Sequence, residues 1–545
     1  MKGEPKEDAV PPPPTVTSDP KPSSGRAFPT IDVIFGTIGT VLGLPTLLYP
    51  FGRDQGLYYY VAREWVTRGS IPYKDVLDHK TPGIYILHAI SIVLFGQHQW
   101  SIRILELVGV LTFGLVLGSS LGRAEKAIRP GVRGAGMMLA ALMYFGYFDF
   151  WNTAQSEIWY SGFGVCAVWA ARRIKTPGRA ALVTGIFAGL TALTKPPGAS
   201  FVVVAVVLLA LRLRRERFPF GRPTALFAAG AAAPILLVLG YFGVVGALPA
   251  MKDVVVGANA YYVSHEGGAR GPFLGHLWWI LKVFAPLSAL FLTVAFVRLG
   301  RGIRKKNWED VERDGTGIGL LVAAVFAVGI QGKFFLLHWG CVPLALVFLG
   351  LATFDGWSER VPRWARHVAL IGTAGIGYAC TAWIDHAATF QRDTLDIEIR
   401  YKRGIYDKRA LYARFQVGVI GFYYGESYEV GKWLEEHTTP EDSVTVRGFQ
   451  PEIYAVCNRR HRGRFFWTTF LTSPSRMYRR AEWLAEDARD LELHPPKYIV
   501  TLAEFHEGLD SAEYYEKRGY TRVVAFRAFI VLSPPAVAVA PPSGP

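Results

Sequence analysis

The chain has 545 residues, of which 51% are hydrophobic and only 19% charged, and its formal net charge is +15. A soluble protein carries about 25% charged residues, so the composition predicts a polytopic α-helical membrane protein. Basic loops between membrane spans explain the positive charge more simply than nucleic-acid binding does, and we expect no nucleic-acid partner.

The chain begins with residues 1–29, which are rich in proline, serine and charge and predict a disordered cytoplasmic tail. A transmembrane domain is expected over residues 30–385. Its apolar segments are long enough for about eleven helices that cross roughly 30 Å of hydrocarbon. They lie near residues 31–50, 101–121, 134–150, 157–172, 180–194, 198–212, 224–247, 277–298, 316–332, 337–353 and 367–385.

Four short loops between these segments are strongly basic. Arginines and lysines gather at residues 123–133, 172–179, 212–222 and 298–306. Lys and Arg are enriched in cytoplasmic loops, and neighbouring basic loops enclose two expected spans each. The pattern therefore predicts a cytoplasmic N-terminus and an extracytoplasmic C-terminus, in what we expect to be a bacterial inner membrane.

The first outer loop contains two segments that are not expected to cross the membrane. Residues 83–95 form an apolar stretch shorter than the minimum of about 17 residues for a span. Residues 55–68 interleave tyrosines and Trp65 with charges, which is typical of a helix at the headgroup level. We expect two interfacial helices there, and an interface belt formed by most of the Tyr and Trp side chains.

Polar residues recur in the outer loops. Such charges are costly beside a bilayer and usually have a function. They are Asp54, Asp78-His79-Lys80, Glu157, Lys195, Arg270 and Lys333. The predicted topology places all of them on one side of the membrane, so we expect them to converge on one site.

After about residue 386 the composition becomes that of a soluble domain. Residues 433–436 follow a helical pattern, and residues 444–446 and 498–500 read as strands. An extracytoplasmic α/β domain is therefore expected over residues 386–545. No motif in it specifies chemistry.

Several motifs of the membrane part resemble those of a known family. They are Asp54-Gln55-Gly56, Asp78-His79-Lys80-Thr81-Pro82, Leu94-Phe95-Gly96 with Arg103, Gln155-Ser156-Glu157, Leu193-Thr194-Lys195-Pro196, and Gln331-Gly332-Lys333 with His338 and Pro343. Over residues 30–353 the chain resembles the C-type membrane glycosyltransferases, which include protein O-mannosyltransferases and lipid A aminoarabinose transferases. The resemblance implies a polyprenyl-phosphate sugar donor, an acceptor that is a lipid, glycan or protein, and transfer at the outer face.

The resemblance also implies roles for individual residues. Asp54 is the expected catalytic carboxylate, which deprotonates the acceptor hydroxyl. Glu157 is a second acid that positions the acceptor or holds Lys80. Lys80 is expected to contact the donor phosphate, with Lys333, Arg270 and Lys195 as further candidates and His79 and His338 as supporting residues.

Some relatives carry a glutamate linked to a metal at the position of His79. A divalent metal held by His79 with His265 or His276 is an alternative, since imidazole suits zinc. No close ligand spacing marks a dedicated metal site, and we predict no metal and no certain cofactor.

Structural roles and other functions stay open on the sequence alone. The structural alternatives are that Asp54 caps a helix and that Lys80 extends to the headgroups. Glu157 would then form a hydrogen bond between helices, and His338 would serve only in packing. The alternative functions are a lipid or lipid-glycan transporter and a non-catalytic envelope assembly protein.

Overall fold

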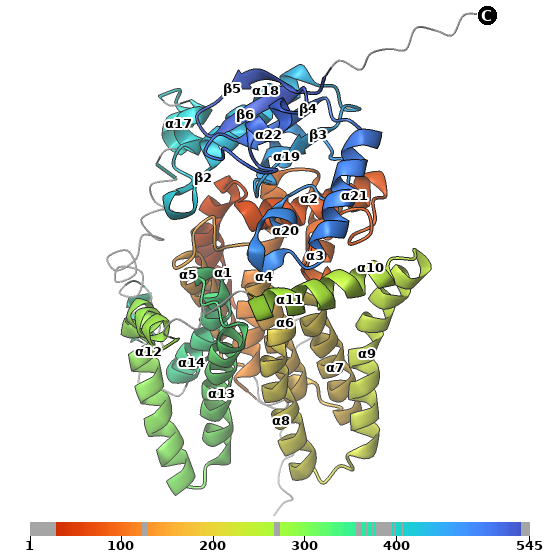
Figure 1. Ribbon diagram of the computed structural model, residues 1–545. Helices are drawn as coiled ribbons and strands as arrows, with labels where there is room; N and C mark the ends of the chain where they lie inside the picture. The colour runs from red at the N-terminus through yellow and green to blue at the C-terminus, as the bar shows by residue number, and fades with distance from the viewer. Residues whose placement is uncertain are drawn as a thin grey trace, which may run out of the picture.

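The computed structural model describes residues 29–122, 128–265, 273–355 and 407–535, with short stretches between 362 and 405. Two parts are stacked on each other (Figure 1), a bundle of long helices and a smaller region that contains the strands. Most of the expected tail 1–29 and of the expected span 367–385 lies outside the described residues.

The helical bundle runs from Thr30 to Asp355. A backbone in hydrocarbon must satisfy its own hydrogen bonds, so long apolar runs form helices there. The bundle contains α1 (Thr30–Gly43), η1 (Leu44–Leu48), α2 (Arg53–Arg68), α3 (Pro82–Phe95), α4 (Gln99–Ser120), α5 (Val132–Phe145), α6 (Ser156–Arg173), α7 (Pro177–Thr194), η2 (Pro196–Gly198), α8 (Ala199–Arg215), α9 (Gly221–Val244), α10 (Leu248–Lys252), η3 (Asp253–Ala258), α11 (Asn259–His265), α12 (Phe273–Arg304), α13 (Trp308–Gln331), η4 (Leu336–Cys341) and α14 (Val342–Asp355).

Helices lie at every expected span within the described part of the chain. Six helical segments there are long and apolar enough to cross a membrane: Thr30–Leu48, Gln99–Ser120, Pro196–Arg215, Gly221–Val244, Trp308–Gln331 and Leu336–Asp355. The other expected spans coincide with α5, α6, α7 and α12. The polytopic helical architecture is confirmed, whereas the total of eleven spans stays a prediction.

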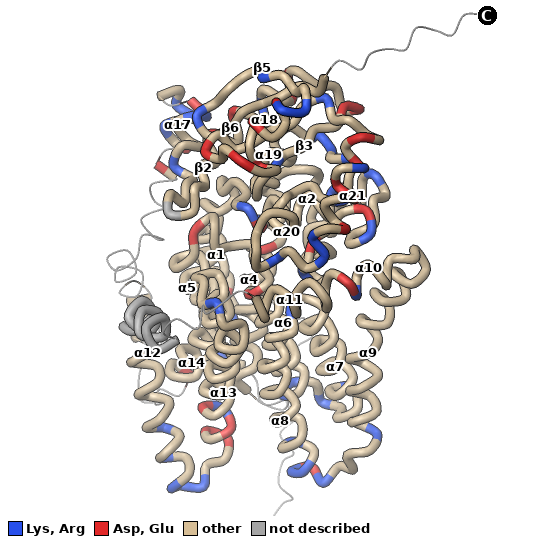
Figure 2. Tube along the Cα trace, in the orientation of Figure 1, with Lys and Arg blue, Asp and Glu red and all other residues tan. Residues whose placement is uncertain are grey.

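The basic loops gather at the end of the bundle farthest from the strands. Figure 2 shows Lys and Arg at the turns between α8 and α9 and between α12 and α13. Contacts join the loops to one another: Arg172 Nε donates to Ser120 O (2.8 Å), Arg212 Nη1 to Ile174 O (2.6 Å), and Arg215 Nη1 to Glu312 Oε2 (2.8 Å). The polar outer loops therefore face the strand-containing region.

The C-terminal region is a small α/β unit built on a four-stranded sheet. Its strand order is β3-β4-β6-β5, in which β3 runs parallel to β4 and the other pairs are antiparallel. The expected strands and helix are confirmed at β3, β4 and α18. The elements are α17 (Lys408–Tyr412), β1 (Gln416–Val417), η5 (Gly418–Ile420), β2 (Phe422–Tyr423), α18 (Tyr424–His437), β3 (Val444–Val446), α19 (Glu452–Cys457), α20 (Thr469–Thr472), η6 (Pro474–Arg476), α21 (Arg480–Leu493), β4 (Tyr498–Leu502), α22 (Ala512–Glu516), β5 (Thr521–Ala525) and β6 (Phe529–Ser533).

Helix α2 is enclosed between these two parts. The prediction that it lies at the headgroup level is wrong for its central residues 55–64, which are all buried. Tyr58, Tyr59 and Tyr60 are 1%, 3% and 1% exposed, so they pack in the core and form no interface belt. The physical reason is the C-terminal region, which covers α2 through contacts between residues far apart in the sequence.

Two features attach the C-terminal region to α2. Arg63 Nη1 donates to Tyr454 O and Arg63 Nη2 to Arg459 O, both at 2.7 Å. A Cβ atom at Gly56 would lie 2.8 Å from the backbone nitrogen of Glu452, so only glycine lets α19 approach α2 this closely. The contact fixes α2 against the C-terminal region.

Helix α3 is 14 residues long, too short to cross a membrane of the usual thickness. One face of it is exposed and apolar, at Ile90, Val93 and Leu94. Its other face packs against α2, α4 and α7. The interfacial position expected for α3 stays a prediction.

Candidate functional site

Asp54 lies in the first turn of α2, where the positive end of the helix dipole favours a carboxylate. It does not cap the helix, because the N-cap is Gly52 and no side chain makes a capping bond there. The Asp54 side chain is half-buried, and among the described residues no hydrogen bond or ion pair holds its carboxylate. The carboxylate is available to accept a proton from a bound molecule.

The segment that carries Lys80 is fixed by hydrogen bonds on both sides. Tyr73 Oη donates to Lys80 O (2.8 Å), and Thr81 Oγ1 donates to Thr194 O (2.6 Å) at the end of α7. A Cβ atom at Gly83 would lie 2.6 Å from Leu193 O, so α3 and α7 touch through their backbones. This close crossing brings Lys80 beside the end of α7.

Lys80 itself has no hydrogen-bond or ion-pair partner for its ammonium group within the described residues. Its Nζ atom lies 6.0 Å from the centre of the Tyr58 ring, on α2. Lys80 and Asp54 therefore reach the same space from two ends of the first outer loop.

The two residues before Lys80 form a buried polar pair. Asp78 accepts a hydrogen bond from Tyr85 Oη, and its Oδ1 atom lies 2.9 Å from Nδ1 of His79. Burial lowers the pKa of His79 to about 4, although the Asp78 carboxylate opposes that shift. Burial alone would raise the pKa of Asp78, but His79, Lys80 and Tyr85 together lower it. Asp78 is thus ionised and His79 neutral near pH 7.

Glu157 begins α6 and forms an ion pair with Lys195, which follows α7. The distance from Lys195 Nζ to Glu157 Oε1 is 2.5 Å, and the Glu157 side chain is 1% exposed. The resemblance led to the expectation that Glu157 positions the acceptor or holds Lys80, and the ion pair that Glu157 forms is with Lys195. The charge of Lys195 also interacts with those of Lys80 and Asp54.

Two motif residues with no predicted role hold the loop before α6 in place. Gln55 Nε2 donates to the carbonyl oxygens of Phe150 (3.1 Å) and Thr153 (2.6 Å). Arg103 Nη1 donates to Thr153 Oγ1 (2.7 Å), and Arg103 Nη2 to Phe150 O (3.1 Å). The loop is thereby fixed to α2 and α4, so the position of Glu157 relative to Asp54 is determined.

Lys333 follows α13 on a strained turn. Phe334, the next residue, has φ of 47°, a left-handed conformation that costs a non-glycine residue about 1–3 kcal/mol. Lys333 Nζ lies 2.9 Å from the centre of the Tyr262 ring, and the Arg476 guanidinium lies 4.5 Å from that same centre. Tyr262 therefore lies beside two cations. Lys333 follows α13, and Arg476 belongs to the C-terminal region.

His338 lies within electrostatic range of three of the predicted lysines. It is 7% exposed, and the charges of Lys80, Lys195 and Lys333 all act on it. The lysines that the sequence predicted to converge therefore do come together, from three separate segments. Arg270, the remaining predicted phosphate contact, lies outside the described residues.

The described residues contain no group of three or more His, Cys, Asp or Glu side chains that could hold a metal ion. The Nδ1 atom of His79 already faces Asp78. His265 Nδ1 lies 3.0 Å from Tyr261 O on its own helix, and the side chain of His276 lies outside the described part.

The C-terminal region supplies contacts that the sequence did not predict. Arg476 adds a guanidinium beside Tyr262, close to Lys333. Its Nη2 atom donates a hydrogen bond to Tyr262 Oη (3.2 Å). Arg53, beside Asp54, donates to Gly421 O (3.4 Å). Neither contact has a local sequence signal, since each joins residues more than two hundred positions apart. The packing of η6 on α11 brings Arg476 to Tyr262.

No protein-family model and no curated protein matches this chain. Among solved structures it is similar to ArnT from Cupriavidus metallidurans bound to undecaprenyl phosphate, with a TM-score of 0.57 and 15% identity over 93% of this chain and 99% of that one. The same protein in the apo state gives a TM-score of 0.53 and 16% identity, over 92% of this chain and 97% of that one. The fold expected from the resemblance to C-type membrane glycosyltransferases is thereby confirmed along nearly the whole chain.

Proposed function

We propose that this chain is an integral membrane glycosyltransferase that moves a sugar from a polyprenyl-phosphate donor to an acceptor at the outer face of the membrane. The observation that carries the proposal is the meeting of one unbonded carboxylate, Asp54, with the ammonium groups of Lys80, Lys195 and Lys333. A reaction between a neutral hydroxyl and an anionic phosphate ester needs these two kinds of group.

In the proposed reaction Asp54 accepts the proton of the acceptor hydroxyl as its oxygen attacks the anomeric carbon of the donor sugar. A new bond forms from that carbon to the acceptor oxygen. The bond from the anomeric carbon to the phosphate oxygen breaks, and polyprenyl phosphate leaves with the electron pair. Lys80, which has no ion-pair partner among the described residues, stabilises the charge that develops on the phosphate.

The remaining charges have supporting roles in this proposal. Lys195 is already neutralised by Glu157, so it contributes less to phosphate binding than Lys80 does. Glu157 orients Lys195, and His338 packs near the lysines. Lys333 and Arg476, both beside Tyr262, are further candidate contacts to the donor phosphate, and so is Arg270.

An apolar groove on α13 suits the lipid part of such a donor. It has a volume of 670 Å³ and is lined by Leu321, Val322, Val325, Phe326, Gly329 and Ile330. These residues form one face of α13, which ends at Gln331, two positions before Lys333. A polyprenyl chain in this groove would place its phosphate near the lysines, and undecaprenyl phosphate is the ligand of the similar ArnT structure.

The domain organisation and topology form part of the proposal. A cytoplasmic tail (1–29) precedes a transmembrane domain of about eleven helices (30–385), and an extracytoplasmic domain (386–545) covers the site. Basic loops at the opposite end of the bundle support this orientation. In a bacterial inner membrane the donor and acceptor would then both be reached from the outer leaflet.

Mass spectrometry of surface glycans, glycolipids and glycoproteins from a deletion strain tests the proposal. Loss of one sugar in the deletion strain, with recovery on complementation by the wild-type chain, is the expected result, and the missing mass identifies the sugar. Unchanged glycans together with accumulation of a lipid-linked glycan on one face of the membrane would instead indicate a transporter.

A further inference from the structure

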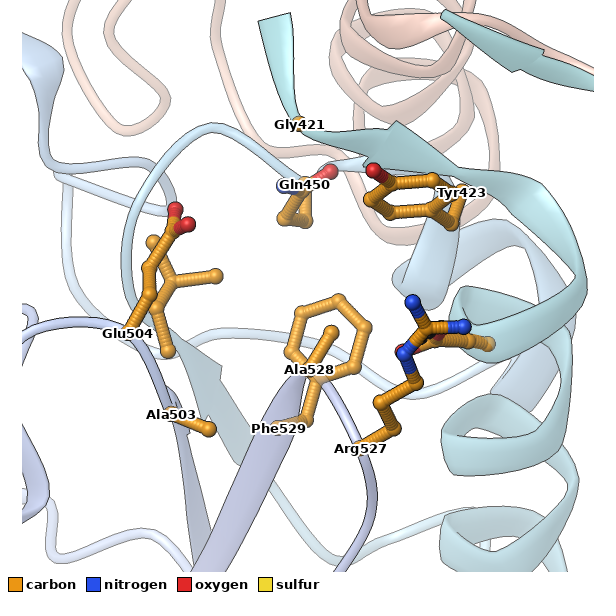
Figure 3. A pocket seen from close by; sticks show the side chains of 10 residues that line it. Gly421, Tyr423, Gln450, Ala503, Glu504, Arg527, Ala528 and Phe529 are labelled. Carbon is orange, nitrogen blue, oxygen red and sulfur yellow. Dashed lines mark ion pairs between the residues drawn. The ribbon is translucent and has the colours of Figure 1, made fainter. Parts of the chain in front are cut away.

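The C-terminal region contains a pocket that the proposed reaction does not use. Its volume is 260 Å³, and it lies where β2, α18, the end of β4 and the start of β6 meet. Figure 3 shows its side chains around an open centre, with Glu504 on one side, Tyr423 and Arg527 on the other, and Phe529 below. A space of this size is below the range of about 300–1,000 Å³ for drug-sized ligands, and suits one sugar ring.

Two carboxylates and one guanidinium line the pocket, and both carboxylates interact with an arginine. Arg527 Nε lies 3.8 Å from Glu426 Oε1, and Glu504 is exposed and interacts electrostatically with Arg53 behind the pocket wall. Each carboxylate thus has one guanidinium nearby. A ligand with a net charge would gain little from this arrangement, whereas a neutral ligand could bond to both kinds of group.

Glu426 provides an unused hydrogen-bond acceptor. Its Oε2 atom is buried and has no hydrogen-bond partner among the described residues, although its side chain keeps 18% of its surface exposed. A buried acceptor without a donor destabilises the folded state. The exposed part of the Glu426 side chain lines the pocket, within reach of a ligand hydroxyl.

The rest of the lining is apolar or aromatic. Leu502, Ala503 and Ala528 present aliphatic surface, and Tyr423 and Phe529 contribute rings. A sugar ring has both hydroxyl groups and apolar C–H faces, so it can bond to the carboxylates and guanidinium while it packs on this surface. The lining matches that mixed chemistry better than it matches an aliphatic or an ionic ligand.

A chain of contacts links the pocket to Asp54. The Gln450 side chain, which lines the pocket, accepts from Arg53 Nη2 at 3.0 Å and donates to Glu452 Oε1 at 2.9 Å when its amide is oriented to satisfy both atoms. Arg53 also donates to Gly421 O (3.4 Å), another lining residue. Arg53 directly precedes Asp54, so the pocket wall and the proposed general base are joined through one residue.

We propose that this pocket binds a neutral sugar unit of the acceptor, and so holds a glycan acceptor beside the first turn of α2. The inference rests on the proposed glycosyltransferase function, which it extends by identifying a glycan as the acceptor class. It assigns Glu426, Glu504 and Arg527 as binding residues rather than catalytic ones.

Binding of simple glycosides to the full-length protein in nanodiscs tests the inference by saturation-transfer NMR. The probes are the methyl glycosides of glucose, galactose and mannose, with methyl glucuronide and methyl glucosaminide as anionic and cationic counterparts. At least one neutral glycoside should bind more strongly than both charged ones. Glu504→Gln and Glu426→Gln should each weaken that binding about tenfold, the effect of losing a hydrogen bond to a charged group.

Glu507→Gln is the matched control, since Glu507 is exposed on the same loop as Glu504 but does not line the pocket. It should leave binding unchanged, whereas Ala503→Leu, which fills the pocket, should abolish it. No binding of any neutral glycoside, or equal effects of Glu504→Gln and Glu507→Gln, would overturn the inference.

The outcomes separate this inference from the proposed function. Sugar transfer that depends on Asp54 without glycoside binding would leave the glycosyltransferase in place and remove the acceptor pocket. Glycoside binding that depends on Glu504, in a protein without transfer activity, would remove the glycosyltransferase. The pocket would then be a glycan-binding site without the acceptor role, and the inference as stated would be wrong.

Discussion

Lys195 Nζ lies 2.5 Å from Glu157 Oε1, and this ion pair joins the end of α7 to the start of α6. The Glu157 side chain is 1% exposed and that of Lys195 is 18% exposed. Removing one member of a buried pair leaves the other charge without a partner, which costs more than the pair itself contributes. The pair therefore fixes the geometry of the site as well as its charge.

Glu157→Gln should destabilise the protein by about 3 kcal/mol, the lower end of the range for breaking a buried pair, because Lys195 keeps some contact with solvent. The double variant Glu157→Gln/Lys195→Met should recover most of this loss, since neither charge is then buried alone. Thermal unfolding of the purified proteins in detergent measures both effects. If the loss of stability in the double variant equalled the sum of the losses in Glu157→Gln and Lys195→Met, the ion pair would be contradicted.

Lys80→Ala should raise the KM for the polyprenyl-phosphate donor at least tenfold, while the KM for the acceptor changes little. The reason is that the Lys80 ammonium has no protein ion-pair partner in the described residues and is left to neutralise the phosphate. Lys74→Ala is the matched control, since Lys74 is an exposed lysine of the same loop. Equal donor KM values for the two variants would rule out the phosphate contact.

Gly83→Ala should reduce activity strongly, because the added Cβ would lie 2.6 Å from Leu193 O and 2.7 Å from the Cα atom of Thr194. Helices α3 and α7 must then separate, and Lys80 moves away from Lys195. Gly240→Ala is the control, as nothing lies within 4 Å of the Cβ position there, and alanine favours a helix by up to about 1 kcal/mol. Unchanged activity in Gly83→Ala would show that the close crossing does not position the site.

The buried His79 should make stability depend on pH. Its pKa is lowered to about 4 by burial, against about 6.5 for a free histidine. Between these pH values the unfolded chain binds a proton that the folded protein does not, so the free energy of unfolding falls as the pH drops. The loss attributable to His79 is about 2 kcal/mol at pH 5.

His79→Asn removes this titration and keeps a side-chain donor for Asp78. The fall in Tm between pH 7.5 and pH 5 should therefore be smaller in the variant than in the wild type. His461 is also buried, and its pKa is lowered to about 3. It therefore contributes to the fall in Tm in both proteins. An equal fall in Tm in the variant and the wild type would contradict a neutral His79 in the folded state.

The sequence was sufficient to predict the helices of the membrane part and the gathering of the outer-loop lysines. Apolar length determines a span, and the four basic loops determine which ends of the spans lie together. Residues such as Lys195 and Lys333 follow directly from those two patterns, because each comes just after a helix that ends at the same face of the bundle. The strands β3 and β4 were predictable from their β-branched residues.

The position of α2 could not be predicted from its own residues. Its tyrosines and charges are typical of a membrane surface, yet the side chains of residues 55–64 are buried against α19 and its neighbours. That contact depends on Gly56 and on Arg63, which bonds to carbonyl groups near residue 454. The partner of Glu157 was missed for a similar reason, since Lys80 and Lys195 are equally plausible by charge and only the α6 and α7 packing selects between them.

The most direct test of the central claim compares two aspartates of the first outer loop in the deletion strain. Asp54→Asn keeps the shape of the side chain and removes the base, whereas Asp75→Asn makes the same change at an exposed position. At matched expression, Asp75→Asn should restore the missing sugar and Asp54→Asn should not, as quantified by mass spectrometry of the envelope glycans. Equal restoration by both variants would contradict catalysis by Asp54.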